Sequence, residues 1–369
     1  MKEKKKVVHF TTVHHPLDPR IYYKQCLSLK KAGYDVTLIA PEAEKYISED
    51  ELTTISTKKH TGKFKRMIFG TIETYRKARK LKADYYHFHD PELLPIGWLL
   101  KNKNNTVIYD IHEDYETGIL QKEYIPKWIR KFIAKTFKGI EKLFSSKMKL
   151  IIAEKYYKEK YPKGFEILNY PILNKNITER EIERNNSNKL LYTGNVTLER
   201  GAYQHVELLR LSQSIEVHLI GYCRKNLADE IIDLAGKNEK RLHLPGVDKY
   251  IPKTEIEEAY RQGDWLAGIA IFPPTDHYLK KELTKFFEYM MAGLPIICSN
   301  FPMWKAFIDQ HQCGITVDPD NEQEIIDAIL YLQNNRDEAI QMGKNGRDAV
   351  MKSLHWGIEE NKLIKWYEQ

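Results

Sequence analysis

Short β-rich runs alternate with helical stretches along almost the whole chain, and this alternation restricts the possible folds more than any other feature of the sequence. The first half contains five such runs: VVHFTT (7–12), VTLIA (36–40), YYHFH (85–89), TVIYDIH (106–112) and KLIIA (149–153). Several of them are apolar on both faces, as parallel strands covered by helices on each side are. Alternation of this kind favours βαβ units in a doubly wound parallel sheet.

A polar, asparagine-rich break at residues 174–188 interrupts this pattern, and the alternation then starts again. Six further β-rich runs follow: KLLYTG (189–194), IEVHLIG (215–221), RLHLPG (241–246), LAGIAIF (266–272), LPIICS (294–299) and GITV (314–317). At roughly 150 residues per domain, a chain of 369 residues is long enough for two domains. The sequence therefore predicts an α/β fold with two doubly wound domains in tandem, followed by a terminal helix whose Trp356 and Trp366 are available for packing.

The composition limits the cell compartment and the partners. No window approaches the ~18 consecutive apolar residues of a membrane span, and the basic start MKEKKK is followed by a strand-like run instead of the apolar stretch of a secretory signal. Four cysteines lie far apart without C-x-x-C spacing, which is typical of reduced thiols. These features predict a cytoplasmic protein. Its net charge of +7 favours an anionic partner, such as nucleic acid, a membrane surface or a phosphorylated metabolite.

Open parallel sheets bind ligands beyond the carboxyl ends of their strands, and the segment TGNVTLERGAYQ (193–204) lies at such a place. Gly194 permits a tight turn there, and Arg200-Gly201 opens the next helix. A helix N-terminus with free N–H groups beside a guanidinium is an anion site. The segment is not a Walker loop, because no Lys-Ser/Thr follows a glycine at the required spacing. The alternative is an ordinary strand–turn–helix with a solvated arginine.

A second candidate lies in ELTKFFEYMMAGLPIICSN (282–300), which has the pattern of a helix followed by a buried strand. Lys285 and Glu288 are three residues apart, so they share one face near the start of the helix. In this position Lys285 can bind a phosphate while Glu288 accepts hydrogen bonds from ribose hydroxyls. The alternative is a surface ion pair of little energetic value.

Histidines and acidic residues follow three strands of the first half, so three loops are expected to meet at one edge of the sheet. The set comprises His14, His15, Asp18 and Arg20, then His89-Asp90-Pro91-Glu92, and then His112-Glu113-Asp114. We expect these side chains to recognise sugar hydroxyls. A zinc site is the alternative, since His87 and His89 alternate onto one strand face, but no metal-binding spacing such as H-E-x-x-H is present. No metal is therefore predicted, and His9 and His87 are expected to pack in the core.

The segment 127–149 predicts a basic amphipathic helix. An apolar stripe recurs at helical period, lysines and Arg130 surround it, and Glu141 is its single acidic residue. Such a helix can lie on anionic lipid. The alternative is a helix that turns its apolar stripe to the core and its basic face to solvent.

Taken together, these segments resemble the family 4 retaining glycosyltransferases of the GT-B fold, in particular the bacterial subgroup of cell-surface polysaccharide synthesis, over nearly the whole chain. Six motifs carry the resemblance: H-x-P-x-D-x-R-I at His14–Ile21, H-D-P-E-L at His89–Leu93, Y-D-x-H-E at Tyr109–Glu113, N-Y-P at Asn169–Pro171, G-N-x-T-x-x-R-G at Gly194–Gly201 and K-x-F-E-Y-M-x-A-G-L-P at Lys285–Pro295. The resemblance implies two Rossmann-like domains that face each other across a cleft. The acceptor-side domain would comprise residues 1–165, the nucleotide-sugar domain residues 166–352, and a terminal helix at about 353–369 would cross back onto the first domain.

The resemblance also implies roles for single residues. Arg200 and Lys285 would bind the donor diphosphate and act in catalysis together with His112, which would lie near the donor sugar. Glu288 would hold the ribose, within a donor site that includes Gly194 and Asn195. The acceptor side would comprise Asp18, Arg20, His89, Asp90 and Glu113. No metal or cofactor is expected, since fixed cations and a helix N-terminus would meet the charge of the departing nucleoside diphosphate.

Two positions depart from the family pattern. Lys280 replaces the first glutamate of an E-x7-E motif, and Asn195 replaces an arginine that often follows the loop glycine. The second change leaves Arg200 and Lys285 as the main cations for a diphosphate.

The sequence thus predicts a metal-independent hexosyltransferase that moves a sugar from a nucleotide-diphosphate sugar to a glycan or lipid-linked acceptor. We expect it in the cytoplasm, with helix 127–149 on the inner face of the membrane. A sugar-nucleotide epimerase of similar fold is the alternative, although the Lys285–Pro295 motif argues against it. A non-catalytic polyanion-binding protein is the third alternative. Because the basic residues gather on one amphipathic helix without stacking motifs, no nucleic-acid partner is expected.

Overall fold

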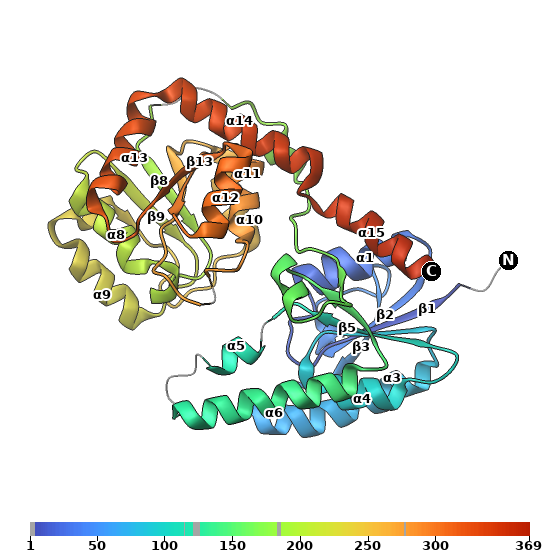
Figure 1. The fold of residues 1–369 in the computed structure, drawn as a ribbon. Coiled ribbons are helices and arrows are strands. Elements are labelled where there is room, and N and C mark those ends of the chain that lie inside the picture. Colours follow the sequence, from blue (N-terminus) through green and yellow to red (C-terminus); the bar gives the residue numbers. More distant parts are fainter. Residues whose placement is uncertain (1–3, 114, 121–125, 183–185, 277) are drawn as a thin grey trace. The chain divides into compact units, whose positions relative to one another are not determined.

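The structure is a computed structural model that describes residues 4–113, 115–120, 126–182, 186–276 and 278–369. Its contacts divide the chain into two compact units. The first unit comprises Met1–Asn169 and Trp356–Gln369, and the second comprises Tyr170–His355. Each unit is built on one parallel sheet with helices on both faces (Figure 1). The prediction of two doubly wound α/β domains is therefore confirmed.

The first sheet has seven parallel strands in the order β3-β2-β1-β4-β5-β6-β7. They are β1 (Lys6–Phe10), β2 (Asp35–Pro41), β3 (Thr53–Thr57), β4 (Tyr85–Phe88), β5 (Thr106–Ile111), β6 (Lys149–Ile152) and β7 (Phe165–Glu166). The strand order reverses between β1 and β4, so the carboxyl ends of these two strands form the point where such a sheet binds ligands. Five strands match predicted runs, whereas β3 and β7 were missed.

Helices cover both faces of the first sheet because its strands alternate apolar residues between the two faces. On one face, Val7 and Leu38 pack with Ile21 and Leu29 of η1 and α1. On the other face, Val8 and Ile39 pack with side chains of α3 and α4. The helical segments are η1 (Pro19–Cys26), α1 (Leu27–Lys31), η2 (Ala43–Lys45), α2 (Lys63–Lys65), η3 (Arg66–Gly70), α3 (Thr71–Leu81), η4 (Pro91–Leu93), α4 (Leu94–Leu100), α5 (Tyr115–Leu120), α6 (Lys127–Ser145) and η5 (Lys155–Glu159).

The terminal helix α15 (Trp356–Glu368) completes the core of the first unit, as predicted, and lies beside α1 (Figure 1). Trp356 donates from Nε1 to the Ser28 hydroxyl at 3.0 Å, and the buried Glu359 carboxylate accepts from the Leu168 amide at 2.8 Å. Leu363 and Tyr367 are fully buried. Burying a large apolar side chain stabilises a fold by roughly 1.5–3 kcal/mol, so this helix is part of the domain and not an appendage.

The second sheet has six parallel strands in the order β10-β9-β8-β11-β12-β13. They are β8 (Lys189–Thr193), β9 (Glu216–Ile220), β10 (Leu242–His243), β11 (Ala267–Ala270), β12 (Ile296–Ser299) and β13 (Gly314–Val317). The order reverses between β8 and β11. All six lie within predicted runs, but β10 keeps only two of its six predicted residues.

The helical segments of the second unit include one inside the polar break that was predicted to lie on the surface. In that segment α7 buries Ile177, which is 1% exposed. The segments are α7 (Lys175–Thr178), η6 (Leu198–Arg200), α8 (Ala202–Leu211), α9 (Lys225–Ala235), η7 (Gly236–Arg241), α10 (Lys253–Gln262), α11 (Thr284–Ala292), α12 (Pro302–His311), α13 (Glu322–Asn334) and α14 (Arg336–Ser353).

Candidate functional site

The chain leaves β8 through Gly194 at the reversal of strand order, and the backbone there is closely packed. Gly194 has a φ of +97°, in the left-handed region that favours glycine. A Cβ on Gly221, the residue after β9, would lie 1.9 Å from the carbonyl oxygen of Gly194, and a Cβ on Gly246 would lie 1.9 Å from that of Gly221. Neither position can accept a side chain, so three successive loops meet backbone to backbone at the carboxyl edge of this sheet.

The following turn places a helix against the same edge. Gly201 has a φ of +75°, and a Cβ there would lie 2.0 Å from the carbonyl oxygen of Ile271. Helix α8 therefore begins in direct contact with the chain that leaves β11, and η6 positions Arg200 immediately before it.

Lys285 and Arg200 meet beside Gly194. A Cβ on Gly194 would lie 2.5 Å from Lys285 Nζ and 3.8 Å from an Nη atom of Arg200. The two cations, which come from the first turn of α11 and from η6, thus lie within 3.8 Å of one point at the end of β8. The side chains that the sequence assigns to one diphosphate share a position next to a strand end and a helix start.

The electrostatics of this pair are unusual for a protein surface. Lys285 is only 8% exposed, and its Nζ lies 4.8 Å from the centre of the Tyr192 ring. Burial lowers the pKa of Lys285 to about 8, with Glu288 opposing and Arg200 adding to this effect. Among the residues that the structure describes, neither Lys285 nor Arg200 forms an ion pair with a carboxylate. Two adjacent, largely desolvated cations repel each other, and an anion between them would relieve that repulsion.

Tyrosine hydroxyl groups hold the side chains of Arg200 and Glu288 in place. Arg200 donates from Nε to the Tyr278 hydroxyl at 3.1 Å. The Glu288 carboxylate accepts from the Tyr260 hydroxyl at 3.1 Å, and Tyr260 in turn contacts Thr193 Oγ1 at 2.7 Å. Glu288 is thereby held at the carboxyl end of β8, with a second oxygen available to a ligand.

These contacts decide between the alternatives for the second unit. Arg200 is half-buried and hydrogen-bonded instead of solvated, and Lys285 is buried instead of forming a surface pair. Asn195 is exposed, and its backbone carbonyl accepts from the Tyr192 hydroxyl at 2.8 Å.

In the first unit, loops that follow β1, β4 and β5 link Asp90, His14 and His112 through an ion pair and a hydrogen bond. His14 Nδ1 lies 2.9 Å from Asp90 Oδ1, and His14 Nε2 lies 3.0 Å from His112 Nε2. His112 Nδ1 is 3.2 Å from the carbonyl oxygen of Asp110. Since a carbonyl only accepts, His112 carries its proton on Nδ1, and its Nε2 accepts from His14.

The pKa values agree with this arrangement. Burial alone would lower the pKa of His14, but its hydrogen bond to Asp90 and the charge of Asp90 raise it to about 9. Burial would raise the pKa of Asp90, yet His14 and the bonds from Thr12 N and Thr11 Oγ1 lower it to about 2. Burial lowers the pKa of His112 to about 4. At neutral pH His14 is therefore an imidazolium between a carboxylate and a neutral imidazole.

Arg20 occupies a different place from the acceptor-lining position implied by the resemblance. It is 3% exposed and binds the buried carboxylate of Asp110 through Nε at 2.8 Å and Nη2 at 2.7 Å. Gln25 and His89 donate to the same carboxylate. Burial would raise the pKa of Asp110, but the Arg20 charge holds it well below its usual range. Arg20 thus stabilises the carboxyl end of β5 by neutralising the buried Asp110 carboxylate, and it is not exposed to a ligand.

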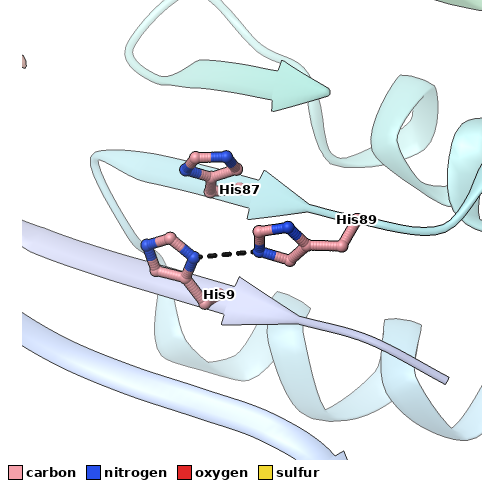
Figure 2. Close-up of side chains that lie close together, drawn as sticks. All are labelled: His9, His87 and His89. Atoms are coloured by element: carbon pink, nitrogen blue, oxygen red, sulfur yellow. Dashed lines mark hydrogen bonds between the residues drawn. The ribbon is translucent and has the colours of Figure 1, made fainter. Parts of the chain in front are cut away.

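His9, His87 and His89 form a buried group on one face of β1 and β4 (Figure 2). The His9 and His89 rings share a hydrogen bond of 3.1 Å between Nδ1 and Nε2, and His87 Nδ1 contacts the Tyr367 hydroxyl at 2.7 Å. Burial lowers the pKa of both His9 and His87 well below the usual range. The predicted core packing of His9 and His87 is confirmed. His89 is buried with them and is not exposed to an acceptor.

The other acceptor-side candidates have mixed positions. Asp18 caps η1 and accepts from the Arg20 amide at 2.9 Å and the Ile21 amide at 3.0 Å. His15 and Glu113 are exposed. Asp114 lies outside the described residues.

Helix α6 exposes part of the apolar stripe that was expected to face either lipid or the core. Trp128, Phe132 and Leu143 are 74%, 69% and 67% exposed. The inward side instead contains Glu141, which accepts from the Tyr109 hydroxyl at 3.0 Å and the Tyr161 hydroxyl at 2.7 Å. At 3.6 residues per turn, the exposed apolar residues share one face, and exposed Lys131, Lys135 and Lys142 flank that face. The purely core-facing alternative is wrong for this stripe.

Sequence reasoning missed several residues of both sites. Asp110 carried a signal, because it is a carboxylate inside the apolar run VIYDI. Gly221 and Gly246 also carried one, since each ends a β-rich run as Gly194 does. Tyr260 and Tyr278 had none, because their partners are distant in the sequence.

Comparisons with known proteins match a family to each unit. Residues 174–349 match the family described as Glycosyl transferases group 1, and residues 20–155 match Glycosyltransferase Family 4. Together the two matched segments cover most of the chain and identify it as a glycosyltransferase. This glycosyltransferase is similar to sucrose-phosphate synthase from Thermosynechococcus elongatus, with 14% identity, a TM-score of 0.75 and coverage of 99% of both chains. It is also similar to HepE from Anabaena in complex with UDP and glucose, with 11% identity, a TM-score of 0.71 and coverage of 99% of this chain and 100% of that one. Both likenesses concern the GT-B fold.

A curated relative matches over a short segment. A GDP-mannose-dependent alpha-(1-6)-phosphatidylinositol monomannoside mannosyltransferase from Mycobacterium tuberculosis is 31% identical over 78 residues, which are 21% of this chain and 20% of the relative. The match thus spans about a fifth of the relative's length.

Proposed function

We propose that this glycosyltransferase moves a hexose, with retention of configuration, from a nucleotide-diphosphate sugar to a glycan or lipid-linked acceptor of cell-surface polysaccharide. The observation that carries the proposal is the meeting of Lys285 and Arg200 beside Gly194. Breaking the bond between the sugar and the diphosphate places negative charge on the departing phosphate, and these two cations lie where that charge would develop. Preorganised charges of this kind are usually the largest catalytic contribution.

In this proposal the donor site needs no metal ion. Lys285 and Arg200 bind the diphosphate, the start of α8 adds N–H groups, and Glu288 accepts from the ribose hydroxyls through the oxygen that Tyr260 leaves open. The name of HepE in complex with UDP and glucose supports a donor of this chemical class.

His112 is proposed to lie near the donor sugar, on the edge of the first sheet. Its Nε2 accepts from the His14 imidazolium, so His14 and Asp90 fix the orientation and tautomer of the His112 ring. Asp18 and Glu113 remain the proposed residues that contact the acceptor, whereas the buried Arg20, His89 and Asp90 act by positioning neighbouring side chains.

A thermal-shift screen with UDP-, GDP- and ADP-sugars tests the donor site. We expect one nucleotide class to raise the melting temperature of the wild type, and we expect Arg200→Ala and Glu288→Ala to abolish the shift. Arg210→Ala, which removes an exposed arginine of α8, is the matched control and should keep it. A shift that survives in both site variants would contradict the donor site. Turnover of the donor without any acceptor would favour the epimerase.

We further propose that α6 holds the enzyme on an anionic membrane surface at the inner face of the membrane. No helix among the described residues is long and apolar enough to cross a bilayer. Exposed Trp128, Phe132 and Leu143 can enter the interface, and each flanking lysine adds ~1 kcal/mol near anionic lipid. The phosphatidylinositol-based acceptor in the name of the mycobacterial relative supports an acceptor at a membrane.

Sedimentation with vesicles tests the membrane proposal. The wild type should sediment with phosphatidylglycerol-containing vesicles and much less with phosphatidylcholine vesicles. The double variant Trp128→Ser, Phe132→Ser should lose this binding, whereas Tyr250→Ser, which removes an exposed aromatic ring of the second unit, should not. Equal and negligible binding of the wild type to both vesicles would overturn the proposal.

A further inference from the structure

A large open cavity lies at the free edge of the first sheet, and its lining belongs entirely to the first unit. Strand β7 is the edge strand, and it pairs only with Ile151 and Ile152 of β6. It does not reach Lys149 and Leu150, which precede them in β6. The cavity lies beside these two residues, has a volume of about 890 Å³, and is also lined by α6, by residues 158–165 and by Trp366. This volume is in the range of small-molecule sites.

Part of the lining is apolar and comes from the hydrophobic cores on both faces of the sheet. Phe165 and Trp366 belong to the core beside α15, and their ring centroids are 6.1 Å apart. Met148 and Leu150 pack against the core on the other face. The short edge strand thus leaves apolar side chains of both cores at the cavity, where the apolar part of a ligand would cover them.

The rest of the lining is strongly basic. Lys138 and Lys160 lie with Nζ at 3.3 and 3.4 Å from the carboxylate oxygens of Glu116. Glu141, the second acid of the lining, accepts from two tyrosine hydroxyls. Four further lysines line the cavity, and none of them forms an ion pair with a carboxylate of the described residues: Lys142, Lys149, Lys158 and Lys163. The lining therefore has an excess of positive charge that suits an anionic ligand.

Two of these four cations are held in position. Lys149 Nζ lies 4.9 Å from the centre of the Trp366 ring, and Lys158 Nζ donates to the carbonyl oxygen of Gly164 at 2.6 Å. A Cβ on Gly164 would lie 2.7 Å from Ile152 Cγ2, so the chain before β7 packs closely against β6. Because each ammonium has three donors, N–H groups remain for an anion. A side chain that is already restrained loses less freedom when a ligand binds.

We propose that this cavity binds the head group of one anionic phospholipid. The phosphate oxygens accept from Lys149, Lys158 and Lys163, and the glycerol backbone with the first acyl carbons covers Phe165 and Trp366. A ligand that joins an anion to an apolar part matches a basic rim around an apolar surface. Basic pockets at the membrane surface bind acidic lipid head groups in this way.

The position of the cavity favours a lipid over a soluble phosphate compound. Lys142 lines the cavity and also flanks the exposed apolar face of α6, next to Leu143. This argument rests on the proposed contact of α6 with an anionic membrane. The cavity is separate from the sugar-transfer site, since β5 and β6 lie between β7 and the reversal of strand order at β1 and β4. The lipid therefore anchors the enzyme and takes no part in the transfer.

Calorimetric titration of the full-length chain with dihexanoyl phosphatidylglycerol, below its critical micelle concentration, tests the cavity without a membrane. We expect one lipid per chain. Dihexanoyl phosphatidylcholine and glycerol 3-phosphate should each bind more weakly by more than about tenfold. Absence of phosphatidylglycerol binding would overturn the proposal. Equal affinity for glycerol 3-phosphate would also overturn it, because the cavity would then recognise a free phosphate ester.

Two double variants test the lysines. Lys149→Gln, Lys163→Gln should weaken phosphatidylglycerol binding by more than about tenfold. Lys31→Gln, Lys80→Gln removes two exposed lysines of the first unit outside the cavity, and it should bind like the wild type. Equal affinity in the two variants would contradict the proposal. Because all four lysines are exposed, both variants should melt at the wild-type temperature, which separates lost contacts from a lost fold.

Tryptophan fluorescence locates the bound lipid. Trp366 lines the cavity and is 7% exposed, so the short-chain lipid should change the emission of the wild type. Trp366→Phe keeps an aromatic ring, and it should retain the affinity but lose most of the emission change. An emission change that persists in full would place the lipid elsewhere and overturn the proposal.

The variant Trp128→Ser, Phe132→Ser separates this proposal from membrane binding by α6. Both side chains lie outside the cavity, so the variant should lose vesicle binding but still bind dihexanoyl phosphatidylglycerol. A wild type that binds the short-chain lipid but does not sediment with vesicles would support the cavity and contradict anchoring by α6. A wild type that sediments with vesicles but does not bind the short-chain lipid would overturn the cavity alone.

Discussion

The two sheets place charged side chains at equivalent positions, where the strand order reverses, but they balance the charges differently. In the first unit the two buried aspartates at this edge each have a cation: Asp90 has His14, and Asp110 has Arg20. In the second unit Lys285 and Arg200 adjoin each other without a carboxylate ion pair among the described residues. The first edge is electrostatically complete, whereas the second has an excess of positive charge that an anionic ligand would neutralise.

This contrast distinguishes charges that stabilise the fold from charges that bind a ligand. Charges that are fully paired inside a domain fix side-chain positions, and removing one partner leaves the other buried and unpaired. Charges that repel each other cost stability in the free protein and are useful only when a ligand arrives. Replacing an arginine is therefore expected to lower stability at the first edge and ligand binding at the second.

The largest effect is expected from removing Arg20, the arginine that is paired with a buried carboxylate. Arg20→Ala leaves the Asp110 carboxylate buried without its cation, and we expect the free energy of unfolding of the first unit to fall by about 3–5 kcal/mol. Arg200→Ala is the matched comparison and should leave stability nearly unchanged. Urea denaturation followed by circular dichroism measures both. Equal losses in the two variants would remove the distinction between the edges.

The Asp90–His14 pair should make the stability of the first unit depend on pH. The pKa of His14 is raised from 6.5 to about 9, so the stabilisation is fully present below about pH 6.5 and is lost as the pH rises through 9. The pKa of Asp90 is lowered to about 2, so acid removes the stabilisation only as the pH falls below about 3.8. We compare the free energy of unfolding of the wild type with that of Asp90→Asn at two pH values. The advantage of the wild type should be larger at pH 6 than at pH 10 by roughly 2–3 kcal/mol. A difference that does not change with pH would mean that His14 is not charged.

Removing the unbalanced lysine should affect activity and not folding. For Lys285→Met we expect kcat/KM for sugar transfer to fall on the order of 100-fold or more. The melting temperature should stay constant or rise, because a buried charge is replaced by an apolar chain of similar length. Lys305→Met, on the exposed side of α12, is the control for loss of one charge. Turnover retained in Lys285→Met would contradict the proposed role.

The smallest expected effect is a pH dependence of the affinity for the nucleoside diphosphate. Since the pKa of Lys285 is about 8 in the free protein, affinity for the nucleoside diphosphate that the screen identifies should fall by about tenfold between pH 7 and pH 9. Arginine stays protonated in this range, so Lys285→Arg should flatten the dependence. Isothermal titration calorimetry at several pH values measures the dissociation constant. An equally steep dependence in the arginine variant would place the titrating group elsewhere.

Much of the fold could be predicted from the sequence, because parallel strands covered on both faces are continuous apolar runs. Strand β3 was missed because TTIST contains a single apolar residue, and β7 because two residues form no pattern. Strand β10 was predicted too long because Pro245 and Gly246 end its pairing early. A local apolar pattern indicates that a strand exists, but pairing with the neighbouring strand sets its length.

The candidate site was predictable to the extent that its residues follow strands in short motifs. Gly194 and Arg200 are of this kind, whereas Lys285 and Glu288 were predicted from the face they share near the start of a helix. The bond between Arg20 and Asp110 was not predictable, because it joins two motifs far apart in the sequence and only the sheet brings them together. The orientation of α6 could not be predicted either. Its apolar stripe fitted either lipid or the core, and only the structure shows that Trp128 and Phe132 are exposed while the one acidic residue turns inward to two tyrosines.

The return of α15 to the first unit has a consequence for synthesis on the ribosome. Residues 170–355 form a continuous segment, so the second unit can close as soon as that segment has emerged. The first unit is made earlier but must wait for residues 356–369, because Leu363 and Tyr367 fill its interior. During translation the nascent amino-terminal half therefore remains incomplete while the later half matures, and the order of folding reverses the order of translation.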